Sequence, residues 1–141
     1  MVDKAGMSDF PITVFHNPDC GTSRNVLRAI LDQGYEPKVV LYLETGWTRG
    51  QLTDLIARMG APVRAILREK NTPAEALGLL DPAVSEEALV AAMVAHPILV
   101  NRPIVETPLG VVLARPSERV FEVLDRRPER FVKEDGEVVV L

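Results

Sequence analysis

The chain is organised around one stretch, Phe15-His16-Asn17-Pro18-Asp19-Cys20-Gly21-Thr22-Ser23-Arg24. A short run of β-forming residues at 12–15 leads into it, and apolar residues at helical spacing follow it from about Thr22 to Gly34. This pattern predicts a strand, a tight loop and a helix, with Cys20 at the helix N-terminus. The free backbone N–H groups and the helix dipole there favour a thiolate and bind a tetrahedral oxyanion such as phosphate. The sequence therefore predicts a nucleophile and an anion site at one place.

Three polar side chains near Cys20 are candidates for tuning its thiol. His16 precedes the loop and Arg24 lies in the first helical turn, where each can add positive charge or hydrogen bonds. Ser23 completes a Cys-x-x-Ser pattern, in which a hydroxyl replaces the second thiol of a redox Cys-x-x-Cys motif. Because Ser23 cannot close a disulfide, we expect another molecule to restore Cys20 after it reacts. The alternative is that Cys20 is a small buried hydrophobe, although a loop apex is poorly suited to a core residue.

Length and composition favour an ordinary globular protein. The 141 residues are 47% hydrophobic and 26% charged, with a formal net charge of -4, so nothing predicts a general attraction for nucleic acid or anionic membranes. A single cysteine excludes an internal disulfide and suits a reducing compartment, and no apolar run approaches the roughly 20 residues of a spanning helix. We therefore expect a cytoplasmic protein with a flexible N-terminal tail at residues 1–10 and a single domain at residues 11–141.

The segments after the first helix predict a strand, a helical insertion and a hairpin. Residues 38–43 form a continuous apolar run that is typical of a parallel strand buried on both faces. Helices are expected at about 48–59, at 62–70, after a capping box that opens at Thr72, and after Ser85, so that residues 48–95 form the insertion. Residues 104–114 predict a hairpin preceded by a cis Arg102–Pro103 peptide bond, and Ser117 is expected to cap a last helix. Residues 131–141 are left open as a tail or a short strand.

This order of elements predicts an α/β fold. A strand-helix-strand unit, a helical insertion and a strand-strand-helix unit form a mixed four-stranded sheet flanked by helices, which is the thioredoxin-like arrangement. That arrangement places a cysteine loop opposite a turn that contains proline. Arg102, which precedes this proline turn, is therefore expected to lie close to Cys20.

Two arginines in the predicted insertion form a second candidate for anion binding. Arg64 and Arg68 lie four residues apart, so a helix at 62–70 would place them on one face. Such a pair most often marks a solvated surface. Like charges at this spacing repel, however, and a bound anion would account for them better.

Four motifs carry a resemblance to a known family. They are residues 16–24, residues 63–68, residues 96–105, and residues 107–110 followed by 115–117. In this order they resemble the glutaredoxin-coupled arsenate reductases of the ArsC type, which belong to the thioredoxin-like superfamily. The resemblance extends from about residue 12 to residue 136, nearly the whole chain.

The resemblance implies the roles of particular residues. It implies that Cys20 is the catalytic nucleophile and that three arginines bind the substrate oxyanion: Arg68, Arg102 and Arg115. It also implies that His16 lowers the thiol pKa and that Ser23 hydrogen-bonds the thiolate. Arg24, which the loop pattern already indicates, is the third residue expected to tune the thiol. Arg115 follows from the resemblance alone, because an arginine at the end of an exposed hairpin strand is usually only solvated.

The resemblance further implies the reaction and its partners. Arsenate would be reduced to arsenite through a Cys20 adduct that glutathione and glutaredoxin resolve, in arsenic detoxification. Glutathione would be a co-substrate, and we expect no bound cofactor, no metal, and neither nucleic acid nor membrane as a partner. Whether another small thiol replaces glutathione is left open.

Three alternatives are a phosphatase, a transcription regulator and a related reductase. A low-molecular-weight tyrosine phosphatase requires Cys-x5-Arg, whereas Arg24 follows Cys20 after three residues. A thioredoxin-like redox-sensing transcription regulator that binds RNA polymerase commonly uses a Cys-x-x-Cys switch, which Ser23 argues against. A paralogue that reduces another thiol-accessible substrate would keep the same scaffold.

Overall fold

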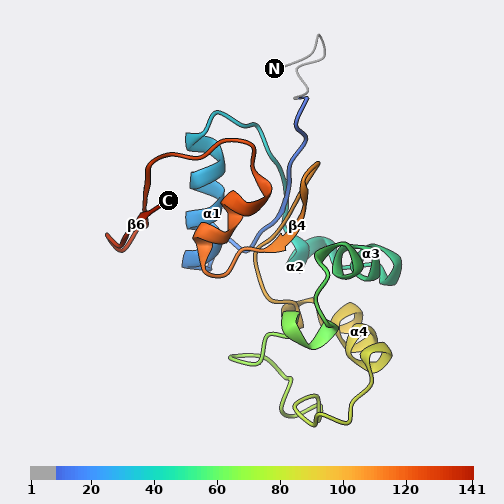
Figure 1. Ribbon diagram of the computed structural model, residues 1–141. Coiled ribbons are helices and arrows are strands. Elements are labelled where there is room, and N and C mark those ends of the chain that lie inside the picture. The colour runs from blue at the N-terminus through green and yellow to red at the C-terminus, as the bar shows by residue number, and fades with distance from the viewer. Residues whose placement is uncertain (1–8) are drawn as a thin grey trace. The chain divides into compact units, whose positions relative to one another are not determined.

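The computed structural model describes residues 9–141, and these form two compact units (Figure 1). The first unit comprises residues 9–41 and Arg102–Leu141, and the second comprises Tyr42–Asn101. Of the predicted tail at residues 1–10, residues 1–8 lie outside the described residues. Phe10 is described and stacks on Tyr35, with ring centroids 5.5 Å apart. The predicted division into a tail and a single domain stays a prediction.

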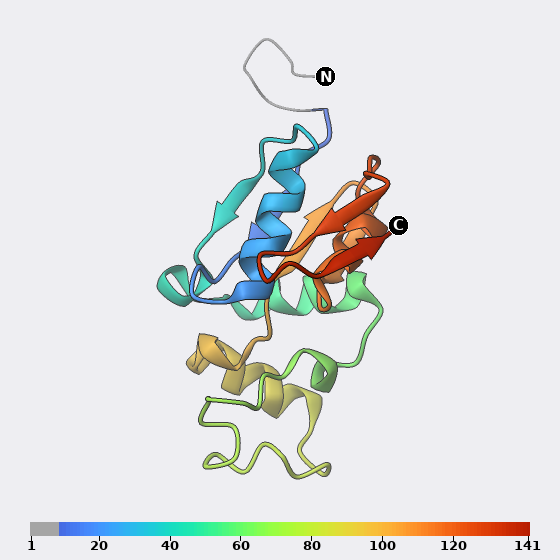
Figure 2. The same ribbon diagram turned by 90° about the vertical axis from the view of Figure 1, so that its left-hand side faces the viewer.

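The first unit contains a mixed four-stranded sheet in the order β2-β1-β3-β4 (Figure 2). Its strands are β1 (Thr13–Phe15), β2 (Lys38–Val40), β3 (Ile104–Thr107) and β4 (Gly110–Leu113). The β1–β2 pair is parallel, whereas the β1–β3 and β3–β4 pairs are antiparallel. Helix α1 (Gly21–Asp32) connects β1 to β2, and Gly34 follows it with a φ of 88°, which glycine adopts readily. The predicted strand-helix-strand unit and hairpin are confirmed.

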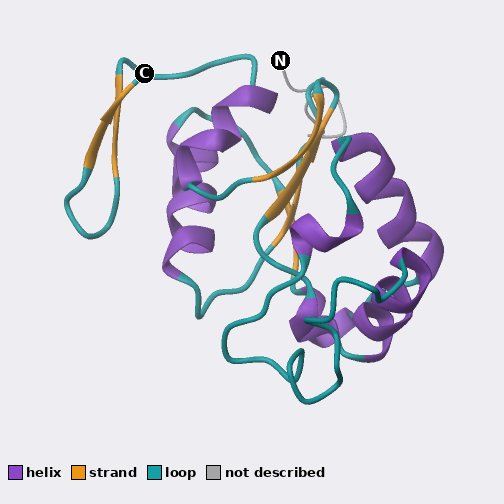
Figure 3. Ribbon diagram, turned by 60° about the horizontal axis from the view of Figure 1, so that its bottom comes forward, coloured by secondary structure: helices purple, strands orange, loops and turns teal. Residues whose placement is uncertain are grey.

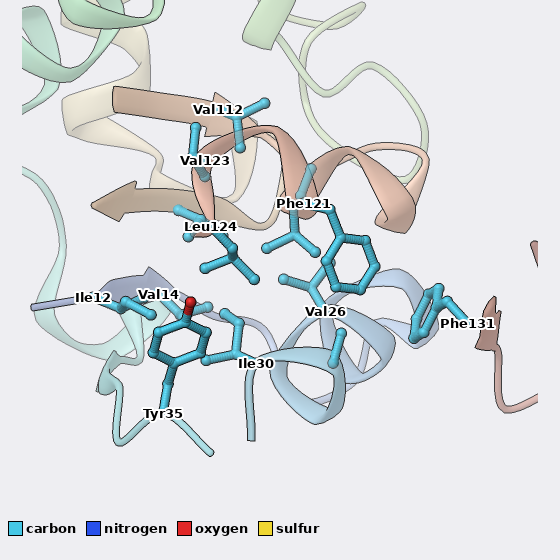
Figure 4. Close-up of a cluster of buried hydrophobic side chains, with 14 residues drawn as sticks. Ile12, Val14, Val26, Ile30, Tyr35, Val112, Phe121, Val123, Leu124 and Phe131 are labelled. Atoms are coloured by element: carbon cyan, nitrogen blue, oxygen red, sulfur yellow. The ribbon is translucent and has the colours of Figure 1, made fainter. Parts of the chain in front are cut away.

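The core of this unit lies between the sheet and two helical segments. Val14, Val105 and Val112 are paired in register across three strands, so their side chains project to the same face of the sheet. They join one buried cluster with side chains of α1, such as Ile30, and of the 3-10 helix η3 (Ser117–Val123) (Figure 4). The sheet is thus flanked by helices, as the thioredoxin-like prediction requires.

The C-terminal residues form a second, small sheet that the sequence left open. Strand β5 (Arg130–Val132) pairs antiparallel with β6 (Val138–Val140), and Figure 3 shows this hairpin as a pair of strands separate from the larger sheet. Phe131 is buried and meets Phe121 of η3 edge to face, with ring centroids 5.6 Å apart. Lys133 pairs with Glu118 of η3 at 3.0 Å. These contacts hold the β5–β6 hairpin against η3 within the first unit.

The second unit is helical. Its elements are α2 (Tyr42–Thr45), α3 (Arg49–Met59), the 3-10 helix η1 (Val63–Ile66), α4 (Glu86–Ala95) and the 3-10 helix η2 (Pro97–Leu99). The predicted cap at Ser85 is present, because its side chain accepts a hydrogen bond from the Ala88 N–H. Thr48 caps α3 in the same way and accepts one from the Gln51 N–H. Across residues 9–141, no helix is long and apolar enough to cross a membrane.

The predicted strand at 38–43 is wrong in extent and in burial. The strand ends at Val40 and Tyr42 begins helix α2. β2 is an edge strand, and Lys38 and Val39 are exposed. The apolar run at 38–43 suggested one strand, but Tyr42 belongs to the next element, α2. There Tyr42 is buried, and its hydroxyl donates to the Val100 carbonyl at 3.2 Å.

Three predicted helices also differ from the structure. η1 ends at Ile66 and Leu67 forms an antiparallel bridge with Val100, so the segment at 62–70 is not one helix. The capping box at Thr72 opens only turns, in which the hydroxyl accepts from the Ala74 N–H two residues later. The last helix is a 3-10 helix that begins at Ser117 after a cis Arg115–Pro116 bond. The predicted cis Arg102–Pro103 bond is confirmed.

Candidate active site

Cys20 lies at the N-cap of α1, where the loop from β1 turns into the helix. Its backbone is extended, with φ −105° and ψ 123°, and its carbonyl accepts the first helical hydrogen bond from the Arg24 N–H at 2.9 Å. The loop is held by Asn17, whose side chain accepts from the Asp19 N–H and whose carbonyl accepts from the Cys20 N–H. The sulfur therefore lies beside the free N–H groups of the first helical turn.

The β3–β4 hairpin brings two arginines to the same place. Ile104 pairs with Leu113, so Arg102 and Arg115, each two residues outside that pair, leave the hairpin side by side. Arg115 Nη1 lies 3.6 Å from Cys20 Sγ and donates to the Arg102 carbonyl at 3.0 Å. Sheet register therefore assembles one thiol and two guanidinium groups from segments about 80 to 95 residues apart in sequence.

These neighbours lower the pKa of the Cys20 thiol. Burial, the largest single effect, acts to raise the pKa, because only 6% of the residue is exposed. The Ser23 backbone N–H, the charge of Arg102, and the hydrogen bond and charge of Arg115 act the other way, and the net shift of the pKa is downward. Cys20 is thereby prepared to react as a thiolate.

His16 and Ser23 form a buried pair beneath the loop. Ser23 Oγ lies 2.7 Å from His16 Nδ1 and accepts from the Asn17 N–H at 3.1 Å. Burial first, and then the positive charge of Arg24, lower the pKa of His16, so the ring is neutral near pH 7. The hydroxyl of Ser23 is directed to His16, and it is the backbone N–H of Ser23 that lowers the thiol pKa. The thiolate-tuning roles of His16, Ser23 and Arg24 stay predictions.

Arg24 contacts the C-terminal segment. Its Nε and Nη2 donate to the two carboxylate oxygens of Glu134 at 3.1 and 2.7 Å, and its Nη1 donates to the Pro18 carbonyl at 2.9 Å. This forked geometry is the strongest arrangement of an arginine with a carboxylate. Arg24 thus connects the Cys20 loop to the segment after β5.

A pocket of about 470 Å³ opens over Cys20. Arg102 and Arg115 line one part of it, and Lys133 and Glu134 are among the C-terminal residues that line another. In the part of the chain that the structure describes, no three His, Cys, Asp or Glu side chains are grouped so that they could hold a metal ion. The pocket can take a small oxyanion against two guanidinium groups, within reach of a nucleophile.

The arginines of the second unit have contacts of their own. Arg64 donates to the Leu79 and Asp81 carbonyls, both at 2.9 Å, so its guanidinium supports the turns at 72–81. Arg68 lies beyond η1, where its N–H donates to the Leu99 carbonyl at 2.8 Å and its Nε to the Lys70 carbonyl. The two therefore do not share a helix face, and oxyanion binding by Arg68 stays a prediction.

Sequence reasoning missed two features of the pocket. Arg115 came only from the resemblance, although counting two residues outward along the hairpin from Ile104 and Leu113 would have placed it beside Arg102. Glu134 was not a candidate, because nothing in the sequence shows that the C-terminal segment returns to the Cys20 loop.

The chain is similar to several known proteins. The model of the ArsC family matches residues 15–123. An arsenate reductase of Escherichia coli is 54% identical over 130 residues, which cover 92% of each chain, and the arsenate reductase ArsI1 of a Synechocystis species is 50% identical over 135 residues, 95% of this chain and 94% of that one. The solved arsenate reductase of Vibrio cholerae superposes with a TM-score of 0.79 at 38% identity and covers 83% of this chain and 100% of its own.

Proposed function

This chain belongs to the ArsC family, and we propose that it reduces arsenate to arsenite through an adduct on Cys20, with electrons from glutathione and glutaredoxin. One observation carries the proposal: the Arg115 guanidinium contacts the Cys20 sulfur in a pocket that Arg102 also lines. A nucleophile and fixed positive charge meet there at a helix N-terminus, which suits covalent catalysis on a tetrahedral oxyanion.

The first step forms the arsenic–sulfur bond. Arsenate binds against the N–H groups of α1 and the guanidinium groups of Arg102 and Arg115, whose planar forks fit its oxygens. The Cys20 thiolate attacks arsenic(V), and one arsenate oxygen leaves as water after it takes up protons. The two arginines stabilise the charge that builds on the remaining oxygens. Arg68 is proposed as a third oxyanion ligand on the strength of the family resemblance.

The next steps need thiols from outside the chain. Cys20 is its single cysteine, and Ser23 has a hydroxyl at the position of a resolving thiol. A glutathione thiol attacks arsenic and displaces a second oxygen as water, which gives Cys20–S–As–S–glutathione. A glutaredoxin thiolate then attacks the glutathione sulfur, forms a mixed disulfide and leaves two electrons on arsenic. Water releases arsenite from Cys20 and returns the thiolate.

The proposed chemistry also indicates the cellular location and the physiological role. Reduced glutathione and glutaredoxin are required for each turnover, so we place the protein in the cytoplasm, where thiols are kept reduced. No bound cofactor enters the proposed cycle, because the electrons arrive with the thiols. Arsenic detoxification is the corresponding physiological role.

The proposal is tested by arsenate-dependent NADPH oxidation in the presence of glutathione, glutaredoxin and glutathione reductase. We expect turnover by the wild type and none by Cys20→Ser. Omission of glutaredoxin should abolish turnover by the wild type. Turnover by Cys20→Ser would overturn the role of Cys20, and full turnover without glutaredoxin would overturn the electron source.

A further inference from the structure

The C-terminal segment lies along one face of α1, directly beside the Cys20 loop. Arg24, Asn25 and Arg28 are spaced so that they share a face of the helix. Arg24 holds the Glu134 carboxylate, Asn25 Oδ1 accepts from the Glu134 N–H at 2.8 Å, and Arg28 donates to the Val132 carbonyl. Three contacts thus hold the end of β5 and the residues that follow it against the first turns of the helix that begins at Cys20.

This segment comes close to the glycine that follows Cys20. A Cβ atom on Gly21 would lie 3.0 Å from Glu134 Oε1, closer than such contacts normally come. The φ of Gly21 is not among the positive values of the chain, so its backbone does not demand glycine. The Glu134 carboxylate therefore lies against the N-terminus of α1, and a side chain at position 21 would displace it.

The same segment forms a wall of the pocket. We use the term C-terminal wall for residues 133–137, four of which line the pocket: Lys133, Glu134, Asp135 and Glu137. An unpaired carboxylate at this place would repel an oxyanion. The pairing of Glu134 with Arg24 offsets its charge and lowers the pKa of the carboxyl, so it stays ionised and bound.

We propose that the Arg24–Glu134 ion pair is a brace that holds the C-terminal wall against the Cys20 loop, in the position that captures the oxyanion. Glu134 is a positioning residue, because it acts through Arg24 and the wall and performs no chemistry on the substrate. The identity of the oxyanion as arsenate rests on the proposed function. The brace itself rests on the contacts of Arg24 with Pro18 on one side and Glu134 on the other.

Charge and position give opposite expectations for Glu134→Gln. If the carboxylate acted only through its charge, its removal would strengthen anion binding and lower the KM for arsenate. If the brace positions the wall, the same change loosens the wall and raises the KM. Arg24→Gln breaks the brace too, but it removes a positive charge. The brace therefore predicts a higher KM in both variants, although they change the local charge in opposite directions.

The Cys20 thiol reports the charge change separately. The charged groups around it are Arg24 and Asp19 of the loop and helix, Arg102 and Arg115 of the hairpin, and Lys133, Glu134, Asp135 and Glu137 of the C-terminal wall. Loss of the Glu134 charge should move the pH midpoint of Cys20 alkylation by iodoacetamide downward, and loss of the Arg24 charge should move it upward. A purely structural defect would not produce opposite shifts.

The experiment compares the wild type with Glu134→Gln, Arg24→Gln and the control Glu122→Gln. Glu122 is paired with Arg119 at 3.2 Å in another exposed arginine–glutamate pair of the first unit, and neither residue lines the pocket. We expect the KM for arsenate to rise about two- to fivefold in both brace variants, as for loss of a good surface ion pair. The control should match the wild type, and kcat should fall by less than KM rises.

Hydrogen exchange tests the brace independently of the arsenate reductase activity. In both brace variants the amides of β5 and β6 should exchange faster than in the wild type and in Glu122→Gln, whether or not arsenate is a substrate. An unchanged or lower KM for Glu134→Gln would overturn the proposal, and so would unchanged exchange in β5 and β6. If the wild type did not turn over arsenate, the proposed function would fail while exchange still decided the brace.

Discussion

Arg115 Nη1 lies 3.6 Å from the Cys20 sulfur and donates to the Arg102 carbonyl at 3.0 Å. The hydrogen bond to the Arg102 carbonyl fixes the Arg115 guanidinium, so its contact with the Cys20 sulfur is in place before substrate binds. A donor fixed in this way does not need to reorganise when charge develops on the substrate, which is the condition for strong transition-state stabilisation.

Arg115→Gln should therefore impair catalysis more than folding. Removal of one preorganised donor of this kind typically costs about 2.7–4 kcal/mol, so kcat/KM for arsenate should fall about 10²- to 10³-fold. The pH midpoint of Cys20 alkylation should rise, because a hydrogen bond and a charge that lower the thiol pKa are lost. Arg119→Gln, at an exposed arginine, is the matched control and should leave both values unchanged. A fall of less than threefold, about 0.6 kcal/mol, would remove Arg115 from the site.

The lowered pKa of Cys20 should also make stability depend on pH. The unfolded chain holds the thiol proton up to the ordinary pKa of a cysteine, whereas the folded chain releases it at lower pH. Between these two values the unfolded state binds more protons, so the free energy of unfolding gains a contribution as pH rises through this window. Thermal melting under reducing conditions should show this gain in the wild type relative to Cys20→Ser. An equal pH dependence of the two proteins would show that the thiol pKa is not lowered.

Ser23→Ala should destabilise the protein through a lost acceptor. The hydroxyl accepts from the Asn17 N–H and contacts His16 Nδ1, and Ser23 and Asn17 are buried, so the change leaves polar groups unsatisfied. A buried unsatisfied group costs about 1–3 kcal/mol, which urea unfolding can measure. Thr53→Ala is the control, since it removes a hydroxyl that is exposed and donates to the Arg49 carbonyl at 2.6 Å. Equal effects of the two substitutions would contradict the buried network.

Gly21→Ala should disturb the brace and little else. The new Cβ would lie 3.0 Å from Glu134 Oε1, and the carboxylate has to move away from it. We expect a higher KM for arsenate in Gly21→Ala, and no further increase when Gly21→Ala is added to Glu134→Ala, where the obstacle is gone. Additive effects in the double variant would show that Gly21 is required for another reason.

Much of the structure of the first unit could be predicted from local sequence patterns. The Cys20 loop, α1 and the β3–β4 hairpin were predictable because strand residues, helix periodicity and turn residues agree there over short spans. In the second unit, the cap at Ser85 was predictable for the same reason. The thioredoxin-like sheet then followed from the order of these elements.

The failures arose where long-range packing outweighed local pattern. The apolar run at 38–43 divides between an edge strand and helix α2, because the buried Tyr42 hydroxyl bonds to Val100, far along the chain. Arg68 does not lie in the expected helix, because η1 ends at Ile66 and Leu67 forms a bridge with Val100. Glu134 reached the pocket through contacts with Arg24 across 110 positions of sequence, which no local signal encodes.

The central claim is that Cys20 forms the bond to arsenic and that outside thiols complete the reduction. The most direct measurement is the retention of radiolabelled arsenic by the protein after rapid gel filtration from arsenate and glutathione without glutaredoxin. The account predicts label on the wild type and none on Cys20→Ser, with release of the label as arsenite when glutaredoxin is added. Equal retention by Cys20→Ser, or release as unreduced arsenate after glutaredoxin, would contradict it.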